Sequence, residues 1–408
     1  MKIKKVLEDI YIFKRNMKAF AYGMLFFMCR VFPVNPYKIV MWTMEGKGSY
    51  GDSPKYIAEE IRYRNKREKI KFEIVWLVTS QTEEFPSDIK LVKASLWNRA
   101  YHLSTAGFWV GNTRTAYGTK KRKRTIYIQT WHAIAGIKPI GKQRGSKLPR
   151  IAQIISESDS KMIDYVLSGN EWSCKMWPDG LIYYGKFIRT GIPRCDILFS
   201  EKERMRQKYR DKYNLPLDTS IILYAPTFRG GSQNRKRRVL ANIGHLDFER
   251  LVNALKSKFG GNWHVFLRLH PQVAEHSDKI VIEKKGSMVI DVSQYPDMNE
   301  LMVASDILLT DYSSSIFESI IMNQVGFLYM EDREEYTKDR GNLMFDSEDL
   351  PFPIAYDMAG LEKQIEIFDD EEYKRKVNEF KEKLGIFEDG MASVRVVDFI
   401  EEKLNDCF

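Results

Sequence analysis

Three short polar segments, each placed directly after a run that predicts a buried strand, contain the most informative chemistry of this chain. They are residues 225–229 (Ala-Pro-Thr-Phe-Arg), 268–271 (Arg-Leu-His-Pro) and 310–315 (Thr-Asp-Tyr-Ser-Ser-Ser). In an open parallel α/β sheet, ligands bind in the crevice at the carboxyl ends of the strands. Two of the segments carry an arginine and the third leads into a helix, so together they predict a binding site for an anionic ligand.

The third segment is expected to hold phosphate at the start of a helix. Apolar residues at 316, 317, 320 and 321 are spaced for one buried helical face. The free N–H groups and the macrodipole of a helix N-terminus favour phosphate, and small hydroxyl side chains add donors. Asp311 would repel phosphate, so we expect it to hold an arginine or a ligand hydroxyl. An ordinary helix-capping cluster is the alternative interpretation.

The other two segments supply cations and an imidazole. Arg229 has the planar group that binds phosphate through two N–H donors, and Thr227 adds a hydroxyl. Arg268 and His270 lie two residues apart and therefore share a face of an extended chain. The imidazole of His270 can neutralise a leaving phosphate or bond a ribose or base, and a structural histidine is the alternative.

A fourth candidate segment lies in the first half of the chain, after a predicted strand at residues 125–128. It covers residues 129–138 (Gln-Thr-Trp-His-Ala-Ile-Ala-Gly-Ile-Lys) and contains His132. We expect His132 to face the second-half site and to act as a general base, because imidazole titrates near working pH. The segment 48–52 (Gly-Ser-Tyr-Gly-Asp) is a weaker indication of an acceptor site, or only a turn.

Composition narrows the possible partners. The chain has 408 residues, of which 44% are hydrophobic, and this is enough for two domains with cores of their own. Its net charge of +9 favours nucleotides, phosphate polymers or an anionic membrane face. Nucleic acid is disfavoured, because the basic runs 120–124 and 235–238 belong to no recognisable binding module and can be solvated loops. Four scattered cysteines form no metal-binding spacing and fit a reducing cytoplasm.

The N-terminal segment predicts a helix that lies in the membrane surface. Residues 1–18 are basic and amphipathic, and residues 19–29 are mostly apolar. This apolar run is too short to cross a bilayer, which needs roughly 20 residues. Its cations are available to anionic headgroups: Lys2, Lys4, Lys5, Lys14, Arg15 and Lys18. The alternative is a helix buried against the domain or against a second subunit.

Two successive β/α patterns predict an α/β fold with two Rossmann-like domains that face a central cleft. The expected strands of the first half lie at residues 39–42, 72–78, 108–110, 125–128 and 165–167. Those of the second half lie at 220–225, 264–269, 288–292, 306–310 and 325–330. The predicted organisation is a membrane-associating segment (1–35), a first domain (36–198), a second domain (199–385) and a C-terminal helix (386–408).

At these residues the chain resembles the CDP-glycerol glycerophosphotransferase family, the teichoic acid primases and polymerases of bacterial cell-wall synthesis. The resemblance rests on residues 129–132, 224–229, 268–271 and 310–314, with support from 48–55 and 190–196. It implies a GT-B-like fold that uses no metal ion or cofactor and is attached peripherally to the cytoplasmic face of the cell membrane. It also implies that an acceptor domain and a CDP-donor domain transfer a polyol phosphate to a lipid-linked, undecaprenyl-type acceptor.

The resemblance also implies roles for individual residues. The expected catalytic residues are His132, His270 and Asp311. The expected donor-binding residues are Pro226, Thr227, Arg229, Arg268, Thr310, Ser313, Ser314, Ser315 and Glu318. The expected acceptor-binding residues are Gly48, Tyr50, Asp52, Lys138 and Arg194.

The expected reaction begins when His132 takes a proton from an acceptor hydroxyl, which then attacks the β-phosphorus of a CDP-polyol and releases CMP. The residues after His132 differ from the Gly-Thr-Pro-Leu-Lys form of many members. The choice between CDP-glycerol and CDP-ribitol therefore stays open, as do primase or polymerase activity and homo-oligomer formation. The alternative functions are a GT-B glycosyltransferase with a nucleotide-sugar donor and a basic membrane-surface scaffold without catalysis.

Overall fold

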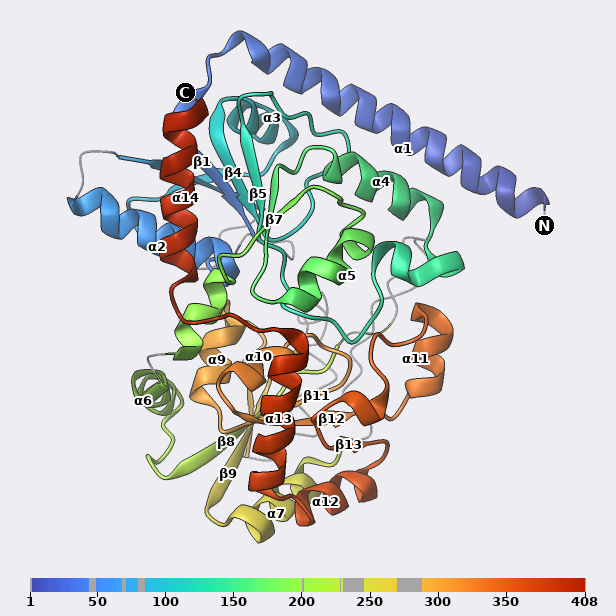
Figure 1. Cartoon of the computed structure of the whole chain (residues 1–408), viewed down its shortest axis with the longest axis vertical. Coiled ribbons are helices and arrows are strands. Elements are labelled where there is room, and N and C mark those ends of the chain that lie inside the picture. Colours follow the sequence, from blue (N-terminus) through green and yellow to red (C-terminus); the bar gives the residue numbers. More distant parts are fainter. Residues whose placement is uncertain are drawn as a thin grey trace.

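Two parallel sheets, each flanked by helices, form the two lobes of the protein (Figure 1). The computed structural model describes residues 2–43, 49–67, 71–79, 85–199, 202–227, 229, 246–269 and 288–407. The predicted pair of Rossmann-like units is confirmed, since every strand pair within the two sheets is parallel. The predicted boundaries between the units, after residues 35, 198 and 385, stay predictions.

The N-terminal lobe is built on a seven-stranded sheet with the order β3-β2-β1-β4-β5-β6-β7. Its strands are β1 (Asn35–Trp42), β2 (Glu73–Val78), β3 (Lys90–Lys93), β4 (Ala106–Gly111), β5 (Ile126–Gln129), β6 (Tyr165–Leu167) and β7 (Lys186–Ile188). The surrounding helices are α2 (Asp52–Arg67), α3 (Leu96–Ser104), η2 (Gly141–Lys147), α4 (Arg150–Ser160) and α5 (Glu171–Leu181).

The C-terminal lobe is built on a six-stranded sheet with the order β10-β9-β8-β11-β12-β13. Its strands are β8 (Thr219–Tyr224), β9 (Asn262–Leu267), β10 (Val289–Asp291), β11 (Ile307–Thr310), β12 (Val325–Tyr329) and β13 (Ile354–Ala355). The helices are η3 (Pro193–Phe199), α6 (Lys202–Tyr213), α7 (Phe248–Phe259), α9 (Met298–Ala304), α10 (Ile316–Ile321), α11 (Arg333–Arg340), η5 (Ser347–Asp349), α12 (Met358–Glu366) and α13 (Asp370–Leu384).

The central strands are buried on both faces, which explains why they read as continuous apolar runs. In β1, Ile39 and Met41 pack into the core on one face of the sheet, and Val40 and Trp42 pack into a second core on the other face. This alternation follows from the two-residue repeat of a strand. The central strands thereby fix the positions of the loops at their carboxyl ends.

The C-terminal helix α14 (Ala392–Cys407) runs back from the lower lobe and packs beside α2 of the upper lobe (Figure 1). Its buried stripe consists of Val396, Val397, Ile400 and Leu404. Arg64 of α2 completes the contact through an ion pair of 3.0 Å with Glu401. The two lobes are therefore joined at this edge by a returning helix as well as by the connecting chain.

The first helix, α1 (Lys2–Met28), continues into the short η1 (Cys29–Val31) and lies along the outer edge of the N-terminal lobe (Figure 1). It packs against α3 and buries Tyr22, Phe26 and Cys29. Within the described part of the chain, no helix has the length and the apolar character needed to cross a membrane.

Candidate active site

The first and third polar segments meet at the carboxyl ends of the neighbouring strands β8 and β11. The backbone N–H and the hydroxyl of Thr227 donate to the two oxygens of Asp311, both at 2.9 Å. The backbone N–H of Tyr312 also donates to Asp311, at 2.6 Å. Asp311 and Thr227 are both buried, so this carboxylate holds the two loops together.

Arg229 binds two carboxylates in this structure. Its Nη1 lies 2.9 Å from Oδ2 of Asp311, and its Nε and Nη2 donate to the two oxygens of Asp332 at 2.6 and 2.9 Å. The guanidinium carbon lies 5.2 Å from the centroid of Tyr312 and 5.1 Å from that of Tyr336, whose rings are stacked at 3.7 Å. Asp311 therefore holds an arginine, as the sequence led us to expect. For Arg229 to bind phosphate, the phosphate must replace Asp311 or Asp332 as its partner.

Asp332 was missed by the sequence analysis. Burial alone would raise its pKa, but the hydrogen bonds from Arg229 outweigh that effect and hold the pKa below its usual value. Asp332 lies three residues after β12, so its position after a strand was the available signal. The carboxylate stays charged at neutral pH and competes with any anionic ligand for Arg229.

The serine segment precedes α10, a helix of only six residues. Ser315 makes no side-chain capping bond, and its hydroxyl donates instead to the hydroxyl of Ser313 at 2.9 Å. Thr310 is fully buried and donates to the carbonyl of Ala225 at 2.6 Å, so its hydroxyl joins β11 to the end of β8. Ser313 and Ser314 are half-buried beside this junction.

Arg268 follows β9, the other neighbour of β8. Its backbone N–H donates to the carbonyl of Tyr224 at 2.9 Å, and its guanidinium donates to the carbonyl of Tyr295. Pro226 is buried beside the same strand ends. The predicted residues His270 and Gly48 lie outside the described residues.

His132 lies three residues after the end of β5 and is half-buried. Trp131 before it has a positive φ of 55°, and its N–H donates to the Gln129 side chain at 3.0 Å. Nδ1 of His132 lies 3.0 Å from the backbone carbonyl of Asn112. A carbonyl can only accept, so the proton of a neutral imidazole is placed on Nδ1 and Nε2 keeps a lone pair. This is the tautomer that a general base requires.

The segment that carries His132 contacts the C-terminal lobe directly. The backbone N–H of Met344 donates to the carbonyl of Ile137 at 2.7 Å, next to the half-buried Lys138. Trp172 of α5 stacks on Phe345 with ring centroids 5.4 Å apart. The loops after the N-terminal strands therefore face the lower lobe.

Three other predicted site residues bind one another at the junction of the lobes. Arg194 is buried, its Nε donates to Glu318 at 3.2 Å, and its Nη1 lies 3.4 Å from Asp52. These side chains come from η3, α10 and α2, so they link the two lobes. The structure thus places Arg194, Asp52 and Glu318 in one ion network, in which Arg194 and Glu318 are buried and Asp52 is half-buried.

Tyr50 is bound within the N-terminal lobe. Its ring lies 5.3 Å from Trp76 and 5.1 Å from Phe85, and its hydroxyl donates to Glu59 at 2.5 Å. Burial, reinforced by this carboxylate, raises the pKa of the phenol. The part of the chain that the structure describes has no group of three or more His, Cys, Asp or Glu residues arranged to hold a metal ion.

Two Rossmann-like lobes, with the loops after the N-terminal strands facing the C-terminal lobe, define a protein of GT-B-like fold. The chain belongs to the family described as CDP-Glycerol:Poly(glycerophosphate) glycerophosphotransferase, whose model matches residues 24–402. The family predicted from the sequence motifs is therefore confirmed, and with it the class of enzyme at the level of the family.

Individual relatives agree with this assignment. The chain is 30% identical over 387 residues to a teichoic acid poly(glycerol phosphate) polymerase of Staphylococcus epidermidis. The aligned region covers 91% of this chain and 52% of that polymerase. The chain is 28% identical over 365 residues to a teichoic acid glycerol-phosphate transferase of Staphylococcus aureus, which covers 86% of this chain and 90% of the transferase. The chain thus spans about half the length of the first relative and most of the second.

A solved structure confirms the GT-B-like fold. The wall teichoic acid polymerase TagF superposes with a TM-score of 0.77 at 26% sequence identity, which covers 100% of this chain and 99% of that chain. In addition to the two lobes, this chain has the long helix α1 at the edge of the N-terminal lobe.

Proposed function

We propose that this protein transfers glycerol phosphate, or ribitol phosphate, from a CDP-activated donor to a hydroxyl group of a lipid-linked acceptor, with release of CMP. The observation that carries the proposal is the geometry of His132, whose Nδ1 faces a backbone carbonyl while Nε2 keeps its lone pair. The family is named for CDP-glycerol, and the two staphylococcal relatives described above are named as teichoic acid enzymes.

In the proposed mechanism, Nε2 of His132 takes the proton of the acceptor hydroxyl. The resulting oxygen forms a bond to the β-phosphorus, while the bond from that phosphorus to the bridging oxygen breaks and CMP leaves. Positioning and charge neutralisation supply most of the catalysis of such a transfer. The groups proposed to neutralise or hold the diphosphate are Pro226, Thr227, Arg229, Arg268, His270, Thr310, Ser313, Ser314 and Ser315.

The remaining predicted residues take two kinds of role in the proposal. Asp311 orients Thr227 and Arg229 through the bonds described above. Asp52, Arg194 and Glu318 act as positioning residues that fix the lobes, because they bind one another. Gly48, Tyr50 and Lys138 are proposed to line the acceptor side, in the domain of residues 36–198, opposite the donor domain of residues 199–385.

The first test is the variant His132→Ala, assayed with CDP-glycerol and a synthetic lipid-linked disaccharide, with products identified by mass. Loss of a general base is expected to lower the rate by about 10²–10⁴-fold. The matched control is His264→Gln, because His264 is a half-buried histidine within β9 and outside the proposed site. Retention of most of the transfer activity by His132→Ala would remove the proposed base.

A donor panel tests the substrate class. CDP-glycerol and CDP-ribitol are compared with UDP- and GDP-sugars for consumption in the presence of the same acceptor. Consumption of a CDP-polyol alone is the expected result, since the proposed site is built for a diphosphate whose β-phosphorus is attacked. Consumption of a nucleotide sugar alone would instead indicate a glycosyltransferase.

Peripheral association with the cytoplasmic face of the cell membrane is part of the proposal. Along α1 and η1, one side is buried against the N-terminal lobe, and the other exposes an apolar stripe. The stripe consists of Val6, Ile10, Phe13, Met17, Phe20, Met24, Phe27 and Val31, which are 47–81% exposed. An apolar stripe on a helix with many lysines is typical of a helix that lies in a membrane surface.

A further inference from the structure

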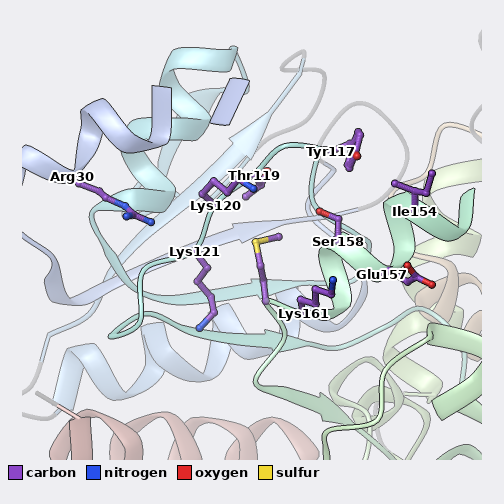
Figure 2. Close-up of a pocket in the computed structure, with 10 residues that line it drawn as sticks. Arg30, Tyr117, Thr119, Lys120, Lys121, Ile154, Glu157, Ser158 and Lys161 are labelled. Carbon is purple, nitrogen blue, oxygen red and sulfur yellow. The ribbon is translucent and has the colours of Figure 1, made fainter. Parts of the chain in front are cut away.

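Two adjoining cavities lie where α1 passes over the N-terminal lobe, and the residues that line them are not residues of the proposed active site. The first has a volume of about 450 Å³ and lies between η1, the loop before β5, and α4 (Figure 2). The second has a volume of about 480 Å³ and runs along α1 itself. Four residues line both cavities, namely Arg30, Tyr117, Lys120 and Ser158.

Two glycines allow the loop before β5 to lie against α1. Gly118 has φ of +103°, and a Cβ atom there would lie 2.4 Å from the carbonyl oxygen of Ala19. A Cβ atom at Gly23 would lie 3.3 Å from Cε of Lys120, so the lysine stem runs across the helix at this glycine. The Tyr117 hydroxyl donates to the Asn16 side chain at 2.8 Å and fastens the same loop. The cavities are therefore held by packing that requires these small residues.

The first cavity has an excess of positive charge. Arg30, Lys120, Lys121 and Lys161 line it together with a single carboxylate, Glu157 (Figure 2). Lys121 is paired with Asp164 at 2.8 Å. Among the described residues, neither Lys120 nor Lys161 forms an ion pair or a side-chain hydrogen bond with the protein, and both are exposed. Their ammonium groups are therefore available to an anion.

The second cavity joins this charge to the apolar stripe of α1. Phe20, Met24 and Phe27 line it and are 65%, 49% and 70% exposed. Arg30 adjoins them, with its guanidinium 5.7 Å from the centroid of Phe27. A ligand that fits both cavities must carry a negative group at one end and an apolar part at the other.

We propose that the two cavities bind one anionic phospholipid of the bilayer. Its phosphodiester lies among Arg30, Lys120 and Lys161, and its acyl chains leave along Phe20, Met24 and Phe27. The assignment rests on the proposed membrane association and adds to it a defined headgroup site. Charge complementarity and continuity with the exposed stripe of α1 favour a lipid of the membrane over a free phosphate.

The site is tested with monomeric short-chain phosphatidylglycerol, below the concentration at which it forms micelles, titrated into the full chain in a calorimeter. The variant is Lys120→Ala with Lys161→Ala, and the matched control is Lys123→Ala with Arg124→Ala, two exposed cations of the same basic run that line neither cavity. Each lysine near an anionic lipid is worth roughly fivefold in affinity, so the double variant is expected to bind about tenfold to 30-fold more weakly. The control is expected to stay within about twofold of the original chain.

Three results would overturn the site: no saturable binding, equal losses in the variant and the control, or equal affinity for short-chain phosphatidylcholine. Glycerol phosphate and a short prenyl diphosphate are titrated in parallel. Binding of either one more tightly than phosphatidylglycerol would also overturn it.

Sedimentation with phosphatidylglycerol vesicles separates this proposal from membrane association itself. The variant Ile10→Ser with Phe13→Ser and Met17→Ser changes the stripe outside both cavities. If it no longer sediments but still binds the short-chain lipid, both proposals stand. If the original chain does not sediment but binds the short-chain lipid, attachment fails and the headgroup site stands. If the lysine variant binds the short-chain lipid normally, the site fails whatever the vesicles show.

Discussion

Arg229 carries one positive charge between two carboxylates, Asp311 and Asp332, and this arrangement decides how it can act. The guanidinium also donates to the carbonyl and the hydroxyl of Thr227, at 2.9 and 2.6 Å, and it lies over the stacked rings of Tyr312 and Tyr336. The planar guanidinium of an arginine keeps its orientation between carboxylates and aromatic rings, whereas the ammonium group of a lysine does not. The direction of this group is thus fixed in advance, and the proposed diphosphate binds it by displacing one of these partners.

This gives a prediction at the residue scale. Arg229→Lys keeps the charge but loses the two-point contact, so kcat/KM with CDP-glycerol is expected to fall by about tenfold or more. The control is Arg250→Lys, because Arg250 makes a two-point contact with Glu362 at the surface. A kcat/KM for Arg229→Lys equal to that of the control variant would show that the orientation of Arg229 is not used.

The residue scale also shows where sequence reasoning reaches its limit. The strand-end positions of Thr227, Arg229 and Asp311 follow from local pattern, and the structure brings these residues together. The bond between Arg194 and Glu318 does not follow from local pattern, because 124 residues separate the two. Their partnership depends on how η3 packs against α10, and no periodicity in either segment encodes that.

At the scale of elements, the strands inside each sheet were predictable and several edge strands were not. β3, β7 and β13 have four, three and two residues, lie at sheet edges and are partly exposed. Such strands have no continuous apolar run, since only one neighbouring strand covers them. The sequence left two interpretations of α1 open, burial against the domain and contact with a membrane. One side of the helix is buried against the domain, and the other side exposes the apolar stripe on which the membrane interpretation rests.

The exposed side of α1 gives a prediction at the scale of elements. The variant Ile10→Ser with Phe13→Ser and Met17→Ser is expected to lower the fraction that sediments with phosphatidylglycerol vesicles by about tenfold or more, because each side chain contributes about 1 kcal/mol or more of apolar burial. Unfolding measured by circular dichroism is expected to be unchanged, since these side chains are exposed. Unchanged sedimentation would exclude the stripe as the attachment surface.

The segment between α13 and α14 gives a pH prediction. Both oxygens of Glu388 accept from the N–H of Ile192, at 3.0 and 3.1 Å, and burial raises the pKa of Glu388 to about 8. The folded chain therefore keeps this proton between about pH 4.5 and pH 8, while the unfolded chain has lost it. The contribution of Glu388 to stability is full below that range and declines as the pH rises through it.

Glu388→Gln is expected to remove this decline, because the amide has no proton to lose and its oxygen can still accept from Ile192. At pH 8.5 the variant should be more stable than the original chain by about 1–2 kcal/mol in urea unfolding, a range discounted for partial exposure. Glu379→Gln, at an exposed position on α13, is the control. The same pH dependence in the original chain and in Glu388→Gln would contradict the assignment.

At the scale of the whole molecule, the two lobes are joined by ion pairs with little exposure to solvent. Lys55 of α2 lies 2.9 Å from Asp297 and 2.5 Å from Glu300, at the start of α9. Burial alone would raise the pKa of Glu300, but Lys55 and Lys208 outweigh it and lower the pKa to about 2. The relative position of the lobes, and hence the distance from His132 to the proposed donor site, depends on this cluster together with Arg194 and α14.

Lys55→Met is expected to destabilise the protein by about 2–4 kcal/mol at pH 7, because it leaves two carboxylates with one fewer cation in a confined place. The stabilisation of a carboxylate with a lowered pKa is present above its unfolded value, near 4.5, and is lost as the pH falls toward 2. The difference between Lys55→Met and the original chain should therefore shrink as the pH falls from 5 to 2. Urea unfolding across this range measures it, with Lys374→Met, which removes one member of an exposed pair on α13, as a control worth less than about 0.5 kcal/mol. A destabilisation by Lys55→Met that is small, or that does not change with pH, would mean that the other contacts alone fix the lobes.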